Sequence, residues 1–235
     1  MLPYYIPLLA ELGTISLACI VAYAGVKAYG KERAAYFLAG SVLWTSIIEN
    51  LGVIDKSYTY YTYAALFNPS YAGYLFWIGQ VPLWIELGWV IVALSLFVLF
   101  HDILLPGRSP FLQAACAGLF AVNIDLVIDP VAVANSLWQW INPTVYIFGV
   151  PIYNFVGWFC LIFFYDLLFN YTVLQNKPVA ILGRIEGLFL KDRYTPSAKT
   201  ARFAFRLIVT ILVVAVLLTI VAELLLAVAK AGGVA

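Results

Sequence analysis

The sequence predicts an all-α protein, a polytopic transmembrane helical bundle of about six spans with its N-terminus outside. Two observations indicate this class. Hydrophobic residues make up 64% of the 235 residues and charged residues 11%, whereas a soluble domain has roughly 45–50% apolar residues. The mean hydropathy is +0.96, and basic residues gather in alternate connections between the apolar runs. We expect one integral membrane domain over residues 1–235.

The apolar runs give the expected spans in chain order. A span needs about 20 apolar residues, and the runs that fit are 4–26, 34–54, 74–100, 110–131, 147–169 and 204–229. A seventh, re-entrant segment around 57–75 or 135–146 is an alternative that the sequence leaves open. The first run has no basic region before it and contains Glu11, so we interpret it as an uncleaved helix rather than a signal peptide.

The basic residues orient these spans. With the N-terminus outside, all but two of the 13 lysines and arginines fall in inner connections, and the exceptions are Lys56 and Lys230. The longest inner connection contains VAILGRIEGLFLK at 179–191, whose apolar residues share one helical face. We expect an interfacial amphipathic helix there, lying on the inner leaflet. No sequence repeat is evident that would indicate an inverted-repeat transporter.

The cysteine, histidine and glycine patterns exclude several chemistries. Cys19, Cys116 and Cys160 lie in apolar runs without a CxxC motif, which is typical of packing residues. His101, the single histidine, stands beside Asp102 and is interpreted as a solvated residue at the end of a span. One histidine is too few for the usual non-haem iron sites, and no GxGxxG follows a strand-like run. We therefore expect no metal and no cofactor.

Acidic residues inside the spans are the main functional signal. Charges within a membrane are costly and normally face a bundle interior or a watery cavity. Asp125 and Asp129 are four residues apart, so a helix places them on one face. Pro130 follows, and we expect the helix to end or kink there. Glu49 and Glu86 fall in the same outer half of the membrane, and these four acids are the candidate catalytic residues.

The surroundings of these acids suggest proton chemistry. No basic residue lies within the spans beside them, so protonation rather than ion pairing is expected to remove their charge. Amides could orient the acids, and aromatic rings attract cations at about 0.5–2 kcal/mol each. The candidate substrate-binding residues of these kinds are Asn50, Asn154, Tyr60, Trp138, Trp140 and Trp158. Glu11 and Glu223, each taken singly, are more typical of structural positions.

A Brønsted acid beside aromatic faces, in a cavity open to lipid, suits protonation of a carbon–carbon double bond in an isoprenoid. The resulting tertiary carbocation can be captured by water, which gives an alcohol, or by another double bond, which gives a ring. The residues alone leave both outcomes open.

Several strings occur in one order that resembles a known family. Glu49 precedes YTYYTY, followed by VPLWIELGW at 81–89, DLVIDPVAV at 125–133 and GVPIYNFVGWF at 149–159. Together they resemble the membrane carotenoid hydratases of the bisanhydrobacterioruberin and γ-carotene 1′-hydratase type, over about residues 45–165. The resemblance implies a cofactor-independent carbon–oxygen lyase that adds water to a terminal double bond of a long polyene, in a prokaryotic cell membrane.

The expected function is therefore intramembrane hydration of a carotenoid-like isoprenoid. Asp125 or Asp129 would donate the proton, while Glu49 and Glu86 would share it or orient water. The expected partners are a lipophilic polyene and membrane lipid, and no nucleic acid. One alternative is a terpenoid cyclase that uses the same acid. Another, from a different class, is a proton-coupled transporter, which should spread its acids along a path to both surfaces.

An aspartate-rich prenyltransferase is a further alternative, because N-x-D-x-x-x-D at 123–129 could bind Mg²⁺ and a diphosphate. Such an enzyme needs basic residues at the same membrane face, and here they are expected at the opposite one.

Overall fold

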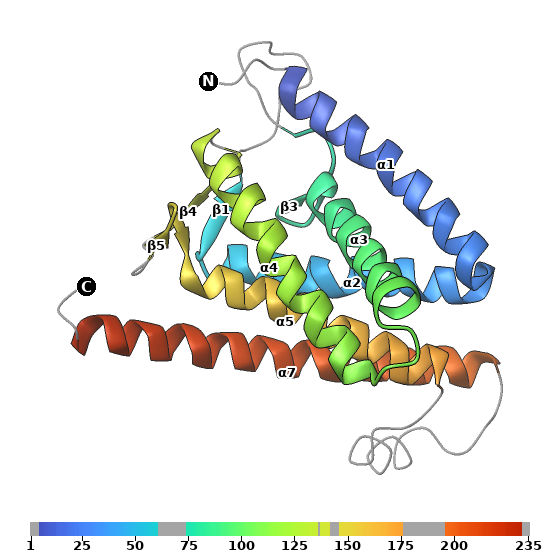
Figure 1. Ribbon diagram of the computed structural model, residues 1–235. Coiled ribbons are helices and arrows are strands. Elements are labelled where there is room, and N and C mark those ends of the chain that lie inside the picture. Colours follow the sequence, from blue (N-terminus) through green and yellow to red (C-terminus); the bar gives the residue numbers. More distant parts are fainter. Residues whose placement is uncertain (1–4, 61–73, 136, 142–145, 176–195, 232–235) are drawn as a thin grey trace.

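The expected polytopic helical bundle is confirmed. The computed structural model describes residues 5–60, 74–135, 137–141, 146–175 and 196–231. In this part of the chain six helices are long and apolar enough to cross a membrane (Figure 1). The interfacial helix expected at 179–191 lies outside the described residues.

Short strand pairs and two π-helical segments interrupt the bundle. The helices are α1 (Tyr5–Tyr29), α2 (Lys31–Ile54), α3 (Leu83–Val98), α4 (Pro110–Ala134), α5 (Ile152–Phe169) and α7 (Pro196–Ala231), with the π-helices η1 (Leu99–Leu104) and η2 (Asn170–Leu174). The strands are β1 (Tyr58–Tyr60), β2 (Trp77–Ile78), β3 (Val81–Pro82), β4 (Trp138–Trp140), β5 (Tyr146–Ile147) and β6 (Val150–Pro151). They form three antiparallel pairs, β1 with β4, β2 with β3 and β5 with β6.

Two helices begin later than expected. The runs from 74 and from 147 open as hairpins, β2–β3 and β5–β6, and the helices α3 and α5 start only after them. Each hairpin ends in Val-Pro, and the proline stands at the N-cap, where its missing N–H costs no hydrogen bond. Hydropathy does not separate a short apolar strand from the helix that follows it.

The expected end of the helix at Pro130 is wrong, because α4 continues through it to Ala134. The proline removes one hydrogen bond near the end of the helix. Beyond it the helical pattern resumes, since the Asn135 N–H donates to the Val131 carbonyl at 3.0 Å. Asp129 therefore lies within a continuous helix, on the same face as Asp125.

Aromatic side chains form the centre of the bundle. Phe37 of α2 lies edge-on to three rings from α3 and α5, with centroid distances of 4.8–5.5 Å. Trp44, two turns further along α2, is also buried and donates a hydrogen bond to the Leu161 carbonyl at 3.1 Å. The helix α7 packs along α5 and α2 (Figure 1), and its outer side exposes apolar side chains, which suits contact with lipid.

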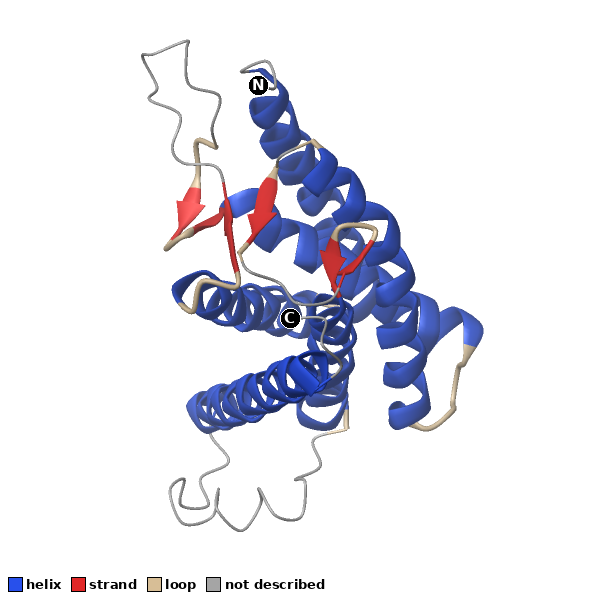
Figure 2. Cartoon of the chain, turned by 90° about the vertical axis from the view of Figure 1, so that its left-hand side faces the viewer, coloured by secondary structure: helices blue, strands red, loops and turns tan. Residues whose placement is uncertain are grey.

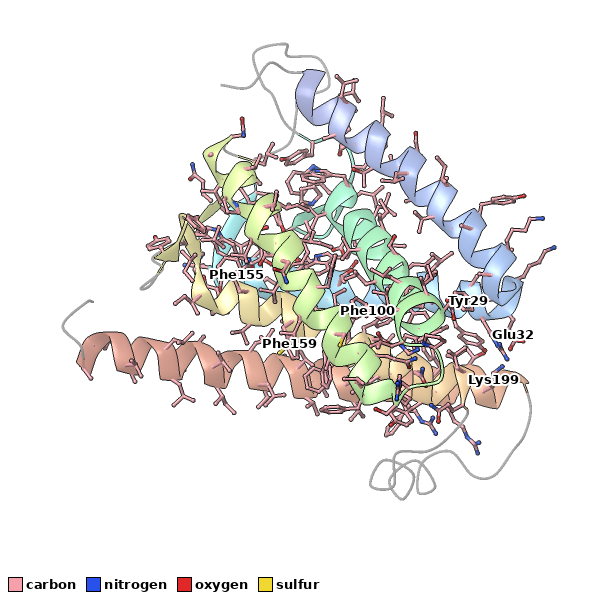
Figure 3. All side chains as sticks on the ribbon, in the orientation of Figure 1. Tyr29, Glu32, Phe100, Phe155, Phe159 and Lys199 are labelled. Carbon is pink, nitrogen blue, oxygen red and sulfur yellow. The ribbon has the colours of Figure 1, made fainter. Side chains whose placement is uncertain are left out.

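The two ends of the bundle differ in chemistry. At one end α1, α2 and α7 converge, and Lys199 forms an ion pair with Glu32 at 2.6 Å (Figure 3). The Tyr36 hydroxyl lies 2.9 Å from that of Thr200 at the same end. The strands gather at the opposite end (Figures 1 and 2). The assignment of the basic end to the inside of the cell stays a prediction.

His101 is buried, so its interpretation as a solvated end residue is wrong. Its Nε2 lies 2.7 Å from Asp166 Oδ1, and its Nδ1 lies 3.2 Å from Asn170 Nδ2. The ring also stacks on Phe97 at a centroid distance of 4.0 Å. The helix does not stop before His101 but continues as the π-helix η1, which carries the ring into the bundle.

Glu11 fixes the first hairpin to α1. Its buried carboxylate accepts the Leu75 N–H at 3.0 and 2.9 Å and the Phe76 N–H at 3.0 Å. The side chain thus satisfies backbone donors just before β2, in agreement with a structural interpretation of this acid.

The order of elements occurs twice. The series α2, β1, β2, β3, α3, η1 is followed by α4, β4, β5, β6, α5, η2. Both copies begin at the basic end, so they form a tandem repeat and not an inverted one (Figure 1). The strands β1 and β4 pair symmetrically about Thr59 and Gln139, as strands from two equivalent copies would. The sequence does not reveal this repeat, because the copies share few residues besides Val-Pro and a Gly-Trp pair.

Candidate functional site

The acid site lies where α2 and α4 end, close to the strands. Glu49 comes from the last turns of α2, and Asp125 and Asp129 come from the corresponding part of α4. Asn154 belongs to the first turn of α5, which packs along α4. The three carboxyl groups are buried, with exposed fractions of 8%, 0% and 3% respectively.

Asp125 and Asp129 form a pair held by one amide. Asn154 Nδ2 donates to Asp125 Oδ2 at 2.9 Å and to Asp129 Oδ2 at 2.7 Å. Because one nitrogen bonds an oxygen of each carboxyl group, the two groups lie side by side. A hydrogen bond between two carboxyl groups requires one of them to carry a proton. The geometry therefore suits a pair that holds one proton between its members.

Glu49 has the opposite environment, because three donors surround it. Tyr58 and Tyr60 donate to Oε2 at 2.6 and 2.9 Å, and Trp89 Nε1 donates to Oε1 at 2.7 Å. Burial, and then the nearby Glu49 carboxyl group, raise the pKa of Tyr58 and Tyr60 well above its usual range, so both hydroxyl groups keep their protons. This arrangement suits a carboxylate that accepts hydrogen bonds.

The strands β1 and β4 pair at the strand end of the bundle (Figure 2), and their aromatic side chains form a cap over the cavity that Glu49 and Asp129 line. Tyr58 packs edge-on against Trp140 with ring centroids 5.1 Å apart, and Tyr60 does so against Trp138 at 6.1 Å. Trp84 of α3 extends the cap, with its ring 6.2 Å from that of Trp138. Described parts of the two re-entrant candidates, 57–60 and 137–141, thus meet each other at this cap.

A cavity of about 130 Å³ lies between the cap and the acids, a size that suits one end of an isoprenoid rather than a whole polyene. Its wall is mostly aromatic and aliphatic, and its acids are Glu49 and Asp129. The residues that line it are Glu49, Tyr58, Tyr60, Trp84, Ile85, Gly88, Trp89, Val92, Ile128, Asp129, Trp138, Trp140, Asn154 and Trp158.

Three of the predicted site residues lie outside this wall. Asp125 stands behind Asp129, with one oxygen that has no partner among the described residues. Glu86 is buried between α2 and α3 and accepts a hydrogen bond from Thr45 Oγ1 at 2.7 Å. Asn50 accepts the Gln80 N–H at 2.7 Å, so it holds the turn of the β2–β3 hairpin. The other predicted residues line the cavity together.

Sequence reasoning missed the two residues that bind Glu49 besides Tyr60. Both occur in the strings YTYYTY and VPLWIELGW, but the sequence assigned no specific role to Tyr58 or Trp89. Trp89 lies one helical turn after Glu86, on the same face of α3, and that spacing is the signal that could have indicated its role.

Fold and site together define an integral membrane protein with a buried acid site under an aromatic cap. The family model described as "carotenoid biosynthesis protein" matches residues 7–232. The chain therefore belongs to this family and is a membrane protein of carotenoid biosynthesis. No curated protein and no solved structure shows a significant match to the chain.

Proposed function

We propose that the protein is a cofactor-independent hydratase in a prokaryotic cell membrane, which adds water across a terminal double bond of a carotenoid-like isoprenoid. The observation that carries the proposal is the aspartate pair bound by Asn154 beside a small aromatic cavity. The family supports a role in carotenoid biosynthesis, and the site chemistry supports the reaction type.

The first step is proton transfer from the aspartate pair. Asp129, which lines the cavity, protonates one carbon of the terminal double bond, and the π electrons form the new C–H bond. Asp125 and Asn154 then share the negative charge that remains on the pair. The tertiary carbocation lies among aromatic rings, each able to stabilise a cation by about 0.5–2 kcal/mol.

The second step is capture of the cation by water. A water oxygen forms the C–O bond, and its proton passes to Glu49, which three donors hold in place. Return of this proton to the aspartate pair restores the site, so the net change is the addition of one water molecule. The polar wall formed by Glu49 and Asn154 favours hydration over the cyclase alternative, which would have to keep water out.

The position of the acids also favours an enzyme over a transporter. A transporter needs polar groups along a path between the two surfaces. Along α2, the buried side chains of Phe37 and Trp44 lie between the basic end and Glu49, and these residues belong to the aromatic centre of the bundle.

The test is product analysis by mass spectrometry in a carotenoid-producing host. The wild type should add one water per reacted end, and the Asp125→Asn, Asp129→Asn double variant should add none. Asp102→Asn, an acid-to-amide change at the opposite end of the bundle, should retain hydration at equal protein level. A product of unchanged mass would indicate a cyclase instead, and an unaltered polyene pool would contradict both reactions.

A further inference from the structure

A second and larger cavity, of about 590 Å³, reaches Glu49 and Asn154 from another side. Its walls come from α2, α5 and α7, and it shares Glu49, Asn154 and Trp158 with the first cavity. Unlike the first cavity, it extends to polar and charged residues near the strand end of the bundle. These residues are Asp55, Lys56, Ser57, Thr219 and Glu223.

The tandem repeat makes the two cavities equivalent. When the first residues of α3 and α5 are aligned, the α3 positions that line the first cavity coincide with α5 positions that line the second. The matched pairs are Trp84 with Tyr153, Ile85 with Asn154, Gly88 with Gly157, Trp89 with Trp158, and Val92 with Leu161. When the ends of α2 and α4 are aligned, Glu49 matches Asp129 in the same way.

Trp89 and Trp158 meet at the boundary between the cavities. Their ring centroids are 4.3 Å apart, and both side chains line both cavities. Such a contact between matched residues is expected where two copies of a repeat face each other. Each copy thus contributes one of the two matched acids, Glu49 or Asp129, and one half of a divided site.

The matched positions differ in polarity. Where the first cavity has Trp84, the second has Tyr153, and the second alone reaches the polar residues Asp55, Ser57 and Thr219, whereas Asn154 lines both. The first cavity is therefore suited to a hydrocarbon, and the second to water. The length of the second cavity supports this assignment. The residues of α7 that line it run from Ala215 to Glu223. This stretch is roughly 12 Å, far short of the ~30 Å of bilayer hydrocarbon that a long polyene can span.

We propose that the second cavity is the water compartment of the site. Water enters past Asp55, Ser57 and Glu223 and reaches the carbocation beside Glu49 and Asn154. The hydrocarbon end occupies the first cavity, where Ile128 of α4 is part of the wall. This inference rests on the proposed hydration, and it assigns separate routes to the two reactants: water forms the C–O bond from one side and releases its proton to Glu49.

Two matched glycines allow a direct test. Gly157 lines only the second cavity and Gly88 only the first, and a Cβ added at either meets no atom of the described residues within 4 Å. Gly157→Leu should narrow the water compartment, and Gly88→Leu the hydrocarbon chamber. Membranes that hold each variant are equilibrated in D₂O before the polyene is added. Mass spectrometry then measures the alcohol and the deuterium in the recovered polyene.

The two variants should separate the two steps. In Gly157→Leu the alcohol should fall at least about tenfold, while deuterium still enters the polyene, because the cation forms and then loses a proton. In Gly88→Leu both signals should fall together. The assignment of the second cavity to water is wrong if Gly157→Leu still forms the alcohol at the wild-type level. It is also wrong if this variant loses the alcohol and the deuterium label together. If the wild type produces neither signal, the hydratase itself is wrong.

A second variant, which fills the same cavity from another helix, controls for a folding defect in Gly157→Leu. Ala222→Phe fills the same cavity from α7, and Ala227→Phe places the same bulk on the exposed side of that helix. The first should give the product pattern of Gly157→Leu, and the second that of the wild type. Equal patterns in both alanine variants would contradict the proposal.

Discussion

Acids of the same site have opposite surroundings. Asp125 and Asp129 share one amide donor, whereas Glu49 accepts hydrogen bonds from three donors. Environment decides which of several carboxyl groups gives a proton and which accepts one. The division proposed between proton donor and proton acceptor therefore follows from neighbours rather than from the acids themselves.

The residue that creates this division is Asn154, and its removal is a prediction at this scale. Asn154→Leu keeps the volume but leaves two buried carboxyl groups without their shared donor. We expect turnover to fall roughly a hundredfold and the free energy of unfolding to drop by about 1–3 kcal/mol. Hydration assays in membranes and thermal unfolding in detergent measure the two effects.

The matched control is Asn123→Leu on α4. Asn123 is exposed, and its amide donates to the Leu119 carbonyl of its own helix, at 2.8 Å. This variant should retain turnover and stability. Unchanged turnover in Asn154→Leu would argue against the aspartate pair as the proton source.

At the scale of elements, the hairpins determine where α3 and α5 start and hence where the lining residues stand. The β2–β3 turn is held by Asn50, whose Nδ2 also donates to the Ile78 carbonyl at 3.1 Å. Gly79 lies in this turn with φ of 64°, a conformation that side chains disfavour. A small turn, fixed by one polar residue of α2, thus sets the beginning of α3.

Gly79→Ala should disturb this turn. The added Cβ would lie 2.3 Å from Asn50 Oδ1, so the amide would have to move and its hydrogen bonds would break. We expect a loss of about 1–3 kcal/mol in the free energy of unfolding, measured by thermal unfolding in detergent. Gly13→Ala in α1, where a Cβ meets no atom within 4 Å, should be neutral or slightly stabilising. Equal melting temperatures for both variants would contradict this role of the turn.

For the whole molecule, composition and basic residues were enough to predict a helical membrane bundle, because lipid restricts the backbone to few solutions. The acids could be found because charges are rare in spans. The hairpins could not, since short apolar strands resemble helix. The bond from Trp89 to Glu49 and the burial of His101 depend on contacts between separate helices, which hydropathy does not contain.

The orientation of the bundle gives a prediction at this scale. Lys56 follows α2, and Arg108 lies between η1 and α4, at the other end; both are exposed. With the N-terminus outside, a membrane-impermeant thiol reagent should label Lys56→Cys in intact cells, and Arg108→Cys only after permeabilisation. The unsubstituted chain gives the background from the native cysteines. The reverse labelling pattern would show that the topology is opposite to the predicted one. Water would then enter the site from the other side of the membrane.

The pairing of β1 with β4 also governs how the protein is made. The segment with Tyr58 and Tyr60 leaves the membrane after α2, but its partner strand emerges only after α3 and α4 have been synthesised and inserted. The nascent chain therefore carries Glu49 for two further membrane crossings before the cap can close over it. Closure also requires both crossings to succeed, because the two strands must arrive on the same side of the bilayer. A chain that misses one insertion step cannot complete its acid site. Activity therefore indicates that both α3 and α4 have been inserted correctly.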